Sequence, residues 1–425
     1  MANDAQPKPA VVMTAAPQPS PTATEISMSR LLGLAIGTRL IVDTGVQFFN
    51  PFLPIIAEGL RTSIITMGWL VGLRSLVGLL SPLFGALADQ HGFRLIMRLG
   101  LATAGIGAFI VGLSSGIGLA AIGMTLWGIG IVAFVPNLQA YISARLPYAQ
   151  RARGIGILEY SWALAGIVGL FIMGLLIAQF GWRTPFFVLG LGMLIMALAL
   201  GILPKARSAS ERAGSLHAAT APYDGNTIGW SVRVRRFFDL GPNARSAYAT
   251  MAAAAALFIA AMQVMITHGA WLRHEYALGP AQLGGIAFIM GLADLSGSGS
   301  VSLLTDKIGK RRSVLLGVIG ATMGFLIMPL LNVSVVMAVV GIVVARAFFE
   351  FAIVSNIPLL SEQAPQQRGK VMTLGAAFNL CGATLAGISG PWLYTTFGVW
   401  GLGLVSAALS LLSSIIVWRW VQDAA

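Results

Sequence analysis

Seven charged side chains lie inside segments that are otherwise apolar. A charged residue is costly in such surroundings, so each is expected to be paired, hydrated or functional. The set contains three cations and four carboxylates: Arg39, Arg74, Arg346, Asp43, Glu159, Asp294 and Glu350.

Local spacing predicts partners for most of these side chains. Arg39 and Asp43 are four residues apart, as are Arg346 and Glu350. Residues at that spacing share one face of a helix, so each pair predicts a local ion pair. Glu159 is expected to pair with a basic loop residue, Arg153, or to extend toward water.

Asp294 is the carboxylate that we expect to have no partner. Three cations cannot neutralise four carboxylates, and Asp294 lies in a small, polar stretch, 291–299, that could line water. Burial favours the neutral form of an unpaired carboxylate, so this group could gain and lose a proton. We expect Asp294 to be a coupling site, with Asp43 as the next candidate. Arg74 is expected to meet an anionic substrate group or a carboxylate from the other half of the chain.

Residues for catalysis or metal binding form no recognisable pattern. The four histidines have no ligand spacing with cysteine or carboxylates, and Cys381 is the single cysteine. The sequence has no phosphate-binding Gly-x-x-x-x-Gly-Lys-Ser/Thr loop. We therefore expect no enzymatic activity and no cofactor or metal, and we expect an ion gradient rather than ATP as the energy source.

The composition places these charges in a bilayer. Hydrophobic residues make up 56% of the chain and charged residues only 10%, whereas about 25% is usual in soluble domains. Apolar runs of about 20 residues predict an all-α membrane protein with twelve transmembrane helices. The expected spans are 31–57, 67–88, 95–114, 118–142, 154–179, 184–203, 247–267, 285–304, 313–331, 335–360, 371–397 and 401–421.

Basic residues are unevenly shared between the two sides of this predicted topology. Only Arg61, Arg183 and Arg273 fall on one side, while the other Lys and Arg residues outside the spans fall on the opposite side. Cytoplasmic loops retain positive charge, so both termini are predicted to be cytoplasmic, in the inner membrane. The net charge of +12 is explained by this orientation, and no nucleic-acid partner is expected.

The polar stretches divide the chain. We expect a disordered cytoplasmic tail at 1–29, a six-helix bundle at 30–203, a cytoplasmic linker at 204–246, a second bundle at 247–421 and a short tail at 422–425. Met28 is an alternative start, and no cleaved signal peptide is expected. Around Trp230 and Phe237 the linker predicts either a basic amphipathic helix on the inner leaflet or a solvated charge run.

One short motif occurs in both halves. In the first copy, Gly85, Asp89, Gly92 and Arg94 follow the second span, and Asp306, Gly309 and Arg311 follow the eighth span at the same spacing. Ser302 stands where the second copy would have its first glycine. Such a repeat indicates a tandem duplication, which is a signature of transporter folds.

This motif resembles that of the major facilitator superfamily, from Arg30 onward. The resemblance implies two pseudo-symmetric six-helix bundles around a cavity that opens alternately to each side. It also implies that the motif aspartates and arginines latch the halves together at the cytoplasmic face. The cavity residues that it suggests are Gln47, Asn50, Asn137, Gln139, Tyr160, Gln263, Asn356 and Asn379.

The fifth span resembles the family's antiporter motif only in part. Ala165, Leu170 and Met173 replace two glycines and a proline of that pattern, and Met124 stands where many proton-coupled exporters have an arginine. Ala165 and Gly169 also form a small-xxx-small pattern, which lets membrane helices pack closely whatever they transport.

We therefore expect a monomeric secondary transporter, surrounded by membrane lipids, that moves a small organic molecule by alternating access. Coupling to protons or another ion and efflux of an amphipathic compound are favoured. Uptake or exchange of an organic anion is the alternative suggested by the three buried arginines. A lipid translocase or a non-transporting receptor on the same scaffold is a further alternative.

Overall fold

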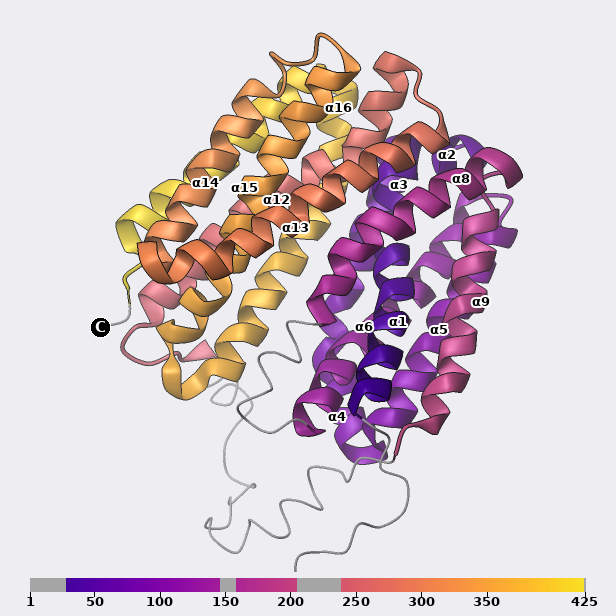
Figure 1. Cartoon of the computed structure of the whole chain (residues 1–425), viewed down its shortest axis with the longest axis horizontal. Helices are drawn as coiled ribbons and strands as arrows, with labels where there is room; N and C mark the ends of the chain where they lie inside the picture. Colours follow the sequence, from indigo (N-terminus) through magenta and orange to yellow (C-terminus); the bar gives the residue numbers. More distant parts are fainter. Residues whose placement is uncertain (1–27, 146–157, 205–237, 424–425) are drawn as a thin grey trace, which may run out of the picture.

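The computed structural model describes residues 28–145, 158–204 and 238–423, and these residues are helical with short connections (Figure 1). The first half contains α1 (Met28–Gln47), α2 (Phe49–Gly59), α3 (Ile64–Val77), η1 (Gly78–Leu80), α4 (Ser81–His91), α5 (Phe93–Leu113), α6 (Ile117–Arg145), η2 (Ala165–Gly169), α8 (Leu170–Phe180), α9 (Thr184–Ala199) and η3 (Leu200–Ile202). The second contains α12 (Ala244–Tyr276), α13 (Pro280–Ile308), α14 (Lys310–Ile327), α15 (Val335–Gln363), η4 (Pro365–Gln367) and α16 (Arg368–Trp420).

The twelve expected spans are confirmed. α1 with α2 forms the first span, α3 to α4 the second, and Leu158–Phe180 the fifth. α16 contains the last two spans, because Gly398 breaks its helical backbone (φ 64°, ψ −158°). The expected linker helix around Trp230 and Phe237 lies outside the described residues.

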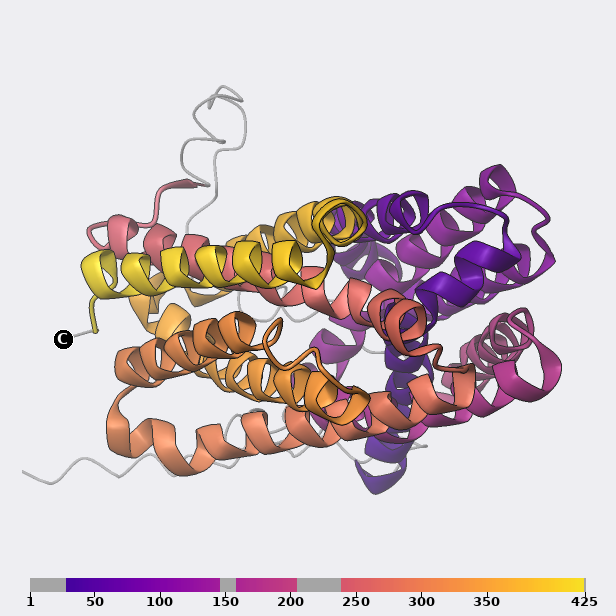
Figure 2. The same cartoon turned by 90° about the horizontal axis from the view of Figure 1, so that it is seen from above.

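The helices form two groups that correspond to the two halves of the chain. In Figure 1 they approach each other near α2, α3 and α8, and they diverge toward α4 and the C terminus. Figure 2, at right angles, shows the groups side by side, with α16 reaching α3. We call the end that carries Gly92 and Gly309 the motif end, and the end that carries Glu58, Arg183 and Arg273 the far end.

The two halves of the chain contact each other at glycine residues. A Cβ atom added to Gly68 of α3 would lie 2.3 Å from the carbonyl oxygen of Gly387 in α16, and one added to Gly269 of α12 would lie 2.1 Å from that of Pro51. α8 and α13 meet in the same way at Gly174 and Gly284. Backbones can approach this closely only where a side chain is absent. By contrast, α4 packs against α5, α6 and η1, all in its own half.

The first span is broken near its middle. α1 and α2 differ in direction by 55°, and Pro51 and Pro54 follow the break. A proline has no N–H to donate, so it weakens the helical hydrogen bonds on its N-terminal side. Arg74 of α3 stabilises the break, because its Nη2 donates to the carbonyl oxygen of Val46 at 3.0 Å.

The fifth span is distorted at the same depth. Residues 165–169 form the π-helical segment η2, a rare form that is frequent at functional sites. A Cβ atom on Gly169 would lie 2.1 Å from Thr44 Oγ1, and one on Gly166 would lie 3.2 Å from Gly291 of α13. The small residues of this span therefore serve close packing, as the small-xxx-small interpretation predicts.

Candidate functional site

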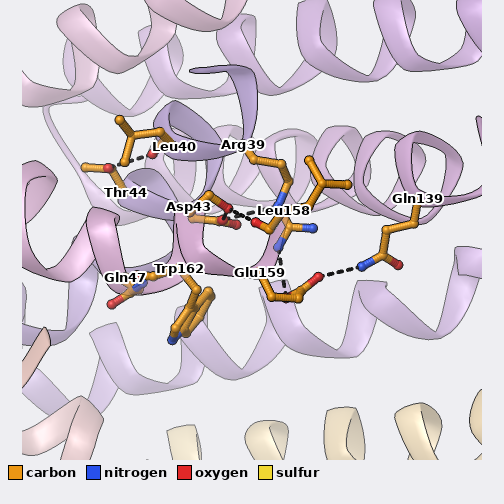
Figure 3. A network of polar contacts seen from close by, with 10 residues as sticks. Arg39, Leu40, Asp43, Thr44, Gln47, Gln139, Leu158, Glu159 and Trp162 are labelled. Atoms are coloured by element: carbon orange, nitrogen blue, oxygen red, sulfur yellow. Dashed lines mark hydrogen bonds and ion pairs between the residues drawn. The ribbon is translucent and has the colours of Figure 1, made fainter. Parts of the chain in front are cut away.

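The expected pair between Arg39 and Asp43 is confirmed and belongs to a larger network (Figure 3). Arg39 Nε donates to Asp43 Oδ2 at 3.1 Å, and Nη2 lies 3.5 Å from Glu159 Oε2. Ser161 donates to the same Asp43 oxygen at 2.6 Å, and Gln139 donates to Glu159 Oε1 at 2.8 Å. Arg39 thus contacts two carboxylates from two spans.

Glu159 contacts a cation from the first span. Its proposed partner Arg153 lies outside the described residues, and the cation that contacts it is Arg39, from the first span. The Glu159 side chain is 50% exposed. It is therefore the accessible member of a network whose other charges are buried.

The expectation that Asp294 has no partner was wrong. Arg346 of α15 binds both carboxylate oxygens of Asp294 in α13, through Nε and Nη2, and its Nη1 contacts the sulfur of Met265. Arg346 and Asp294 are both buried. An arginine fork matches a carboxylate in this two-point arrangement, which is stronger than a single contact.

The predicted pair of Arg346 with Glu350 was also wrong, for the same reason. Arg346 turns toward α13, so Glu350 has no ion pair or hydrogen bond within the part of the chain that the structure describes. Glu350 is partly exposed and packs near Gly297, where an added Cβ would lie 2.9 Å from the Glu350 Cβ. The unpaired carboxylate required by the charge count is Glu350.

Arg74 meets no carboxylate among the described residues. Besides its hydrogen bond to Val46, its guanidinium lies 5.0 Å from the ring centre of Phe49, a cation–π distance. Its Nη1 is buried and has no hydrogen-bond acceptor within the described ranges. The structure therefore places Arg74 at the break in the first span.

A small cavity lies between the two halves, beside the distorted spans. It is lined by Gln47, Asn50, Pro51, Gly166, Leu170, Met265, His268, Ala287, Met290, Gly291 and Arg346. Most of its wall is apolar. Gln47 donates to the carbonyl oxygen of Trp162 at 2.8 Å, so part of its amide is already occupied.

Two of the expected lining residues, Gln47 and Asn50, are found on this cavity. Asn137 instead donates to the carbonyl oxygens of Ala133 and Phe84. Asn356 and Asn379 also lie away from it, as does Gln263, which donates to Ser389. His268 was missed, because as a lone histidine it shows no ligand pattern in the sequence.

An ion pair between the halves was also missed. Arg273 of α12 donates to both carboxylate oxygens of Glu58 in α2, at 3.0 Å and 2.8 Å. The two residues belong to different loops in the sequence, and only their location on the same side of the predicted topology could have suggested the contact.

The two motif copies have the same structure. Gly92 (φ 91°, ψ 138°) and Gly309 (φ 95°, ψ 145°) share one backbone conformation. Arg94 donates to the carbonyl oxygen of Gly201, and Arg311 to that of Trp418, each 107 residues further along the chain. Carbonyls at helix ends lack partners within their helix, so these arginines satisfy them.

The motif arginines therefore bind within their own halves in this conformation, which differs from the expected latch. Asp89 is exposed and has no hydrogen bond to any described residue. The side chain of Asp306 lies outside the described part of the structure. Gly85 is helical, with open space around it.

Comparison with known proteins agrees with the fold and the repeat. The family model of the Major Facilitator Superfamily matches residues 35–272 and 246–425. The uncharacterized MFS-type transporter YceJ of Bacillus subtilis is 23% identical over 92% of this chain and 95% of its own length. The multi-drug resistance efflux pump PmrA of Streptococcus pneumoniae is 29% identical, over 41% of this chain and 45% of its own. The inward-open structure of the xylose transporter XylE from E. coli superposes with a TM-score of 0.69 at 16% identity, covering 93% of this chain and 96% of XylE. The chain is therefore a transporter that belongs to the Major Facilitator Superfamily.

Proposed function

We propose that this transporter exports amphipathic organic cations across the cytoplasmic membrane in exchange for protons. The proposal rests on which of the charged side chains inside the spans form ion pairs. Arg39 and Arg346 bind carboxylates directly, while Glu350 forms no direct ion pair among the described residues. A cationic substrate would supply that missing positive charge.

The organic-anion alternative finds less support. Arg39 and Arg346 are already bound to carboxylates, which neutralise much of their charge. Of their nitrogens, only Nη1 of Arg39 has no partner among the described residues. Arg74 has one unoccupied donor, Nη1, but its guanidinium is held by Val46 and lies close to the Phe49 ring. An anion site would therefore depend on the buried Nη1 groups of Arg39 and Arg74, on side chains that are otherwise engaged.

The direction of transport is suggested by relatives. PmrA is named as a multi-drug resistance efflux pump, and the multidrug resistance protein Stp of Mycobacterium tuberculosis is 30% identical over 41% of this chain and 34% of its own length. The matches cover less than half of each protein. They favour export and amphipathic substrates, which also suit the largely apolar cavity wall.

We assign the motif end to the cytoplasm, because most of the basic loop residues belong to that side. Both termini then lie in the cytoplasm. Contacts between the halves, including Glu58 with Arg273 and Gly68 with Gly387, are on the α2 and α3 side, and the groups diverge toward α4 (Figure 1). This conformation is therefore the one that accepts substrate from the cytoplasm.

We assign proton coupling to Glu350 in place of Asp294. In the cytoplasm-facing state, protonated Glu350 releases its proton as the cation binds, and the carboxylate then balances the positive charge. After the halves rock to the other side, the cation leaves and Glu350 takes up an external proton. One proton enters the cell for each cation that leaves it, and the charge within the cavity stays constant.

The test is flux in proteoliposomes of purified protein, with the membrane potential clamped at zero. A pH gradient directed to drive protons out of the vesicle should drive ethidium, a permanent cation, inward, and should not move carboxyfluorescein, an anion. Gradient-driven movement of carboxyfluorescein alone would favour the organic-anion alternative. Binding of ethidium without flux would favour a receptor, and flipping of a fluorescent phospholipid instead of ethidium would favour a lipid translocase.

A further inference from the structure

His268 presents an unused hydrogen-bond acceptor to the central cavity. The residue lies on α12, is 1% exposed and forms part of the cavity wall. Its Nδ1 lies 2.6 Å from the carbonyl oxygen of Met265. Because a carbonyl oxygen can only accept, Nδ1 carries the proton, and in the neutral ring Nε2 is the acceptor.

His268 Nε2 has no hydrogen-bond partner within the described part of the chain, and it is buried. Buried polar atoms are almost always satisfied, and one that is not requires an explanation. The other polar residues of the wall leave it unpaired: Gln47 donates to Trp162, Arg346 binds Asp294, and Asn50 makes no hydrogen bond to Nε2. Gln47 and Arg346 carry N–H donors of the kind that Nε2 accepts, but the hydrogen bonds that they make go to these other acceptors.

The rest of the wall indicates what kind of molecule would satisfy this acceptor. Pro51, Leu170, Met265, Ala287 and Met290 provide apolar contacts. Thioether side chains adapt to ligands of different shapes. The cavity thus combines an adaptable apolar surface with a few polar groups, one of which is the buried and unpartnered acceptor of His268. In such a site apolar contact gives affinity and the polar groups give orientation.

We infer that His268 determines specificity in this cavity, by accepting a hydrogen bond from an N–H or O–H donor on the transported amphipathic cation. The inference rests on the proposed function and adds the chemical class of substrate to it. Cations with a primary or secondary amine or a hydroxyl should be preferred over fully alkylated cations of the same ring system.

Two fluorescent cations test the inference directly. Rhodamine 123 and tetramethylrhodamine methyl ester share a ring system, an ester and a single positive charge, but only rhodamine 123 carries N–H donors. Their dissociation constants can be measured by fluorescence polarisation with the full-length protein in nanodiscs. We compare the wild type with His268→Phe, which removes the acceptor, and His268→Gln, which keeps an acceptor near the Nε2 position.

We expect His268→Phe to raise the dissociation constant for rhodamine 123 about tenfold, because the loss of a single hydrogen bond to a buried partner has about that effect. Tetramethylrhodamine methyl ester should bind the variant within about twofold of the wild type, which also shows that the variant is folded. His268→Gln should retain most of the affinity for rhodamine 123. Met290→Leu, an apolar change on the same wall, should affect both probes alike.

Other outcomes would overturn the inference. Equal weakening of both probes by His268→Phe would mean that the ring only packs against the ligand, and no change for either would mean that it does not contact the ligand. In both cases, binding of the alkylated probe would leave the proposed function intact. If the wild type bound neither cation, the proposed substrate class would fail, and the inference with it.

Discussion

Arg273 and Glu58 join the two halves of the transporter at the far end, through two parallel hydrogen bonds between α12 and α2. They lie near the close approach of Gly269 to Pro51. The pair is formed in the conformation that diverges at the motif end, and it must separate before the cavity can open on the far side. It is therefore placed to bias the equilibrium between the two access states.

Glu58→Gln should shift that equilibrium toward the state open at the far end. Both side chains are partly exposed, and such pairs contribute about 0.2–1 kcal/mol, a change of about 1.4-fold to fivefold in the population ratio. Labelling of Asn50→Cys by an impermeant maleimide from the far side, in a Cys381→Ser background, measures the shift. The reversed pair, Glu58→Arg with Arg273→Glu, should restore the wild-type rate. A reversed pair that labels like Glu58→Gln would show that the ion pair does not set this equilibrium.

Asp294→Asn should destabilise the protein rather than simply uncouple it. The change leaves Arg346 buried without its counter-ion, and breaking a buried pair in this way costs about 3–5 kcal/mol. We expect a large fall in the apparent Tm measured in detergent. The double variant Asp294→Asn with Arg346→Met removes both charges and should recover much of the loss. A single variant as stable as the wild type would mean that the pair contributes little to folding.

Glu350→Gln should uncouple transport without destabilising the protein, the reverse of the result expected for Asp294→Asn. Its carboxylate has no ion pair or hydrogen bond among the described residues, so the substitution should leave the Tm nearly unchanged. It should abolish accumulation of ethidium driven by a pH gradient and spare counterflow exchange, because exchange requires no net proton movement. Glu362→Gln is a control, since Glu362 pairs with Lys310 near the end of α15. Gradient-driven accumulation by Glu350→Gln would exclude this residue as the coupling site.

Local spacing predicted one of the two expected ion pairs. Arg39 and Asp43 pair as their four-residue spacing suggests, yet Arg346 and Glu350 have the same spacing and do not. Spacing along a helix makes a contact possible but does not decide between it and a better one. Arg346 finds a two-point partner in Asp294, whose location opposite α15 depends on how α13 packs.

The fold was more predictable than the site, for a physical reason. Apolar length, loop charge and the repeated motif are properties of the chain itself, and they yield twelve spans in two related halves. The contacts of Glu159 and Arg273 join segments that are distant in sequence. Arg74 donates to a carbonyl group at the break in the first span. The presence of Pro51 and Pro54 does not by itself give the direction of that bend.

The motif glycines should be intolerant of a side chain. Gly92 and Gly309 have φ near 91° and 95°, a conformation that costs other residues about 1–3 kcal/mol. Gly92→Ala should therefore lower the apparent Tm. Gly85→Ala is the matched control, because Gly85 is helical and no atom lies within 4 Å of the added Cβ. Equal Tm values for the two variants would mean that the turn relaxes without strain.

Asp89 should act in the state in which the motif end is closed. In the present conformation it is exposed, without a hydrogen bond to the described residues, and its neighbour Arg94 is bound to Leu203 and Gly201. If Asp89 latches the halves when the motif end closes, Asp89→Asn removes a contact of that state alone. Transport of ethidium should then slow, while its affinity for the cavity in the present conformation stays within a few fold. Gln90→Ala, at an equally exposed neighbouring position, should transport at the wild-type rate. Stopped-flow flux together with equilibrium binding separates the two quantities, and a wild-type rate for Asp89→Asn would remove Asp89 from the gate.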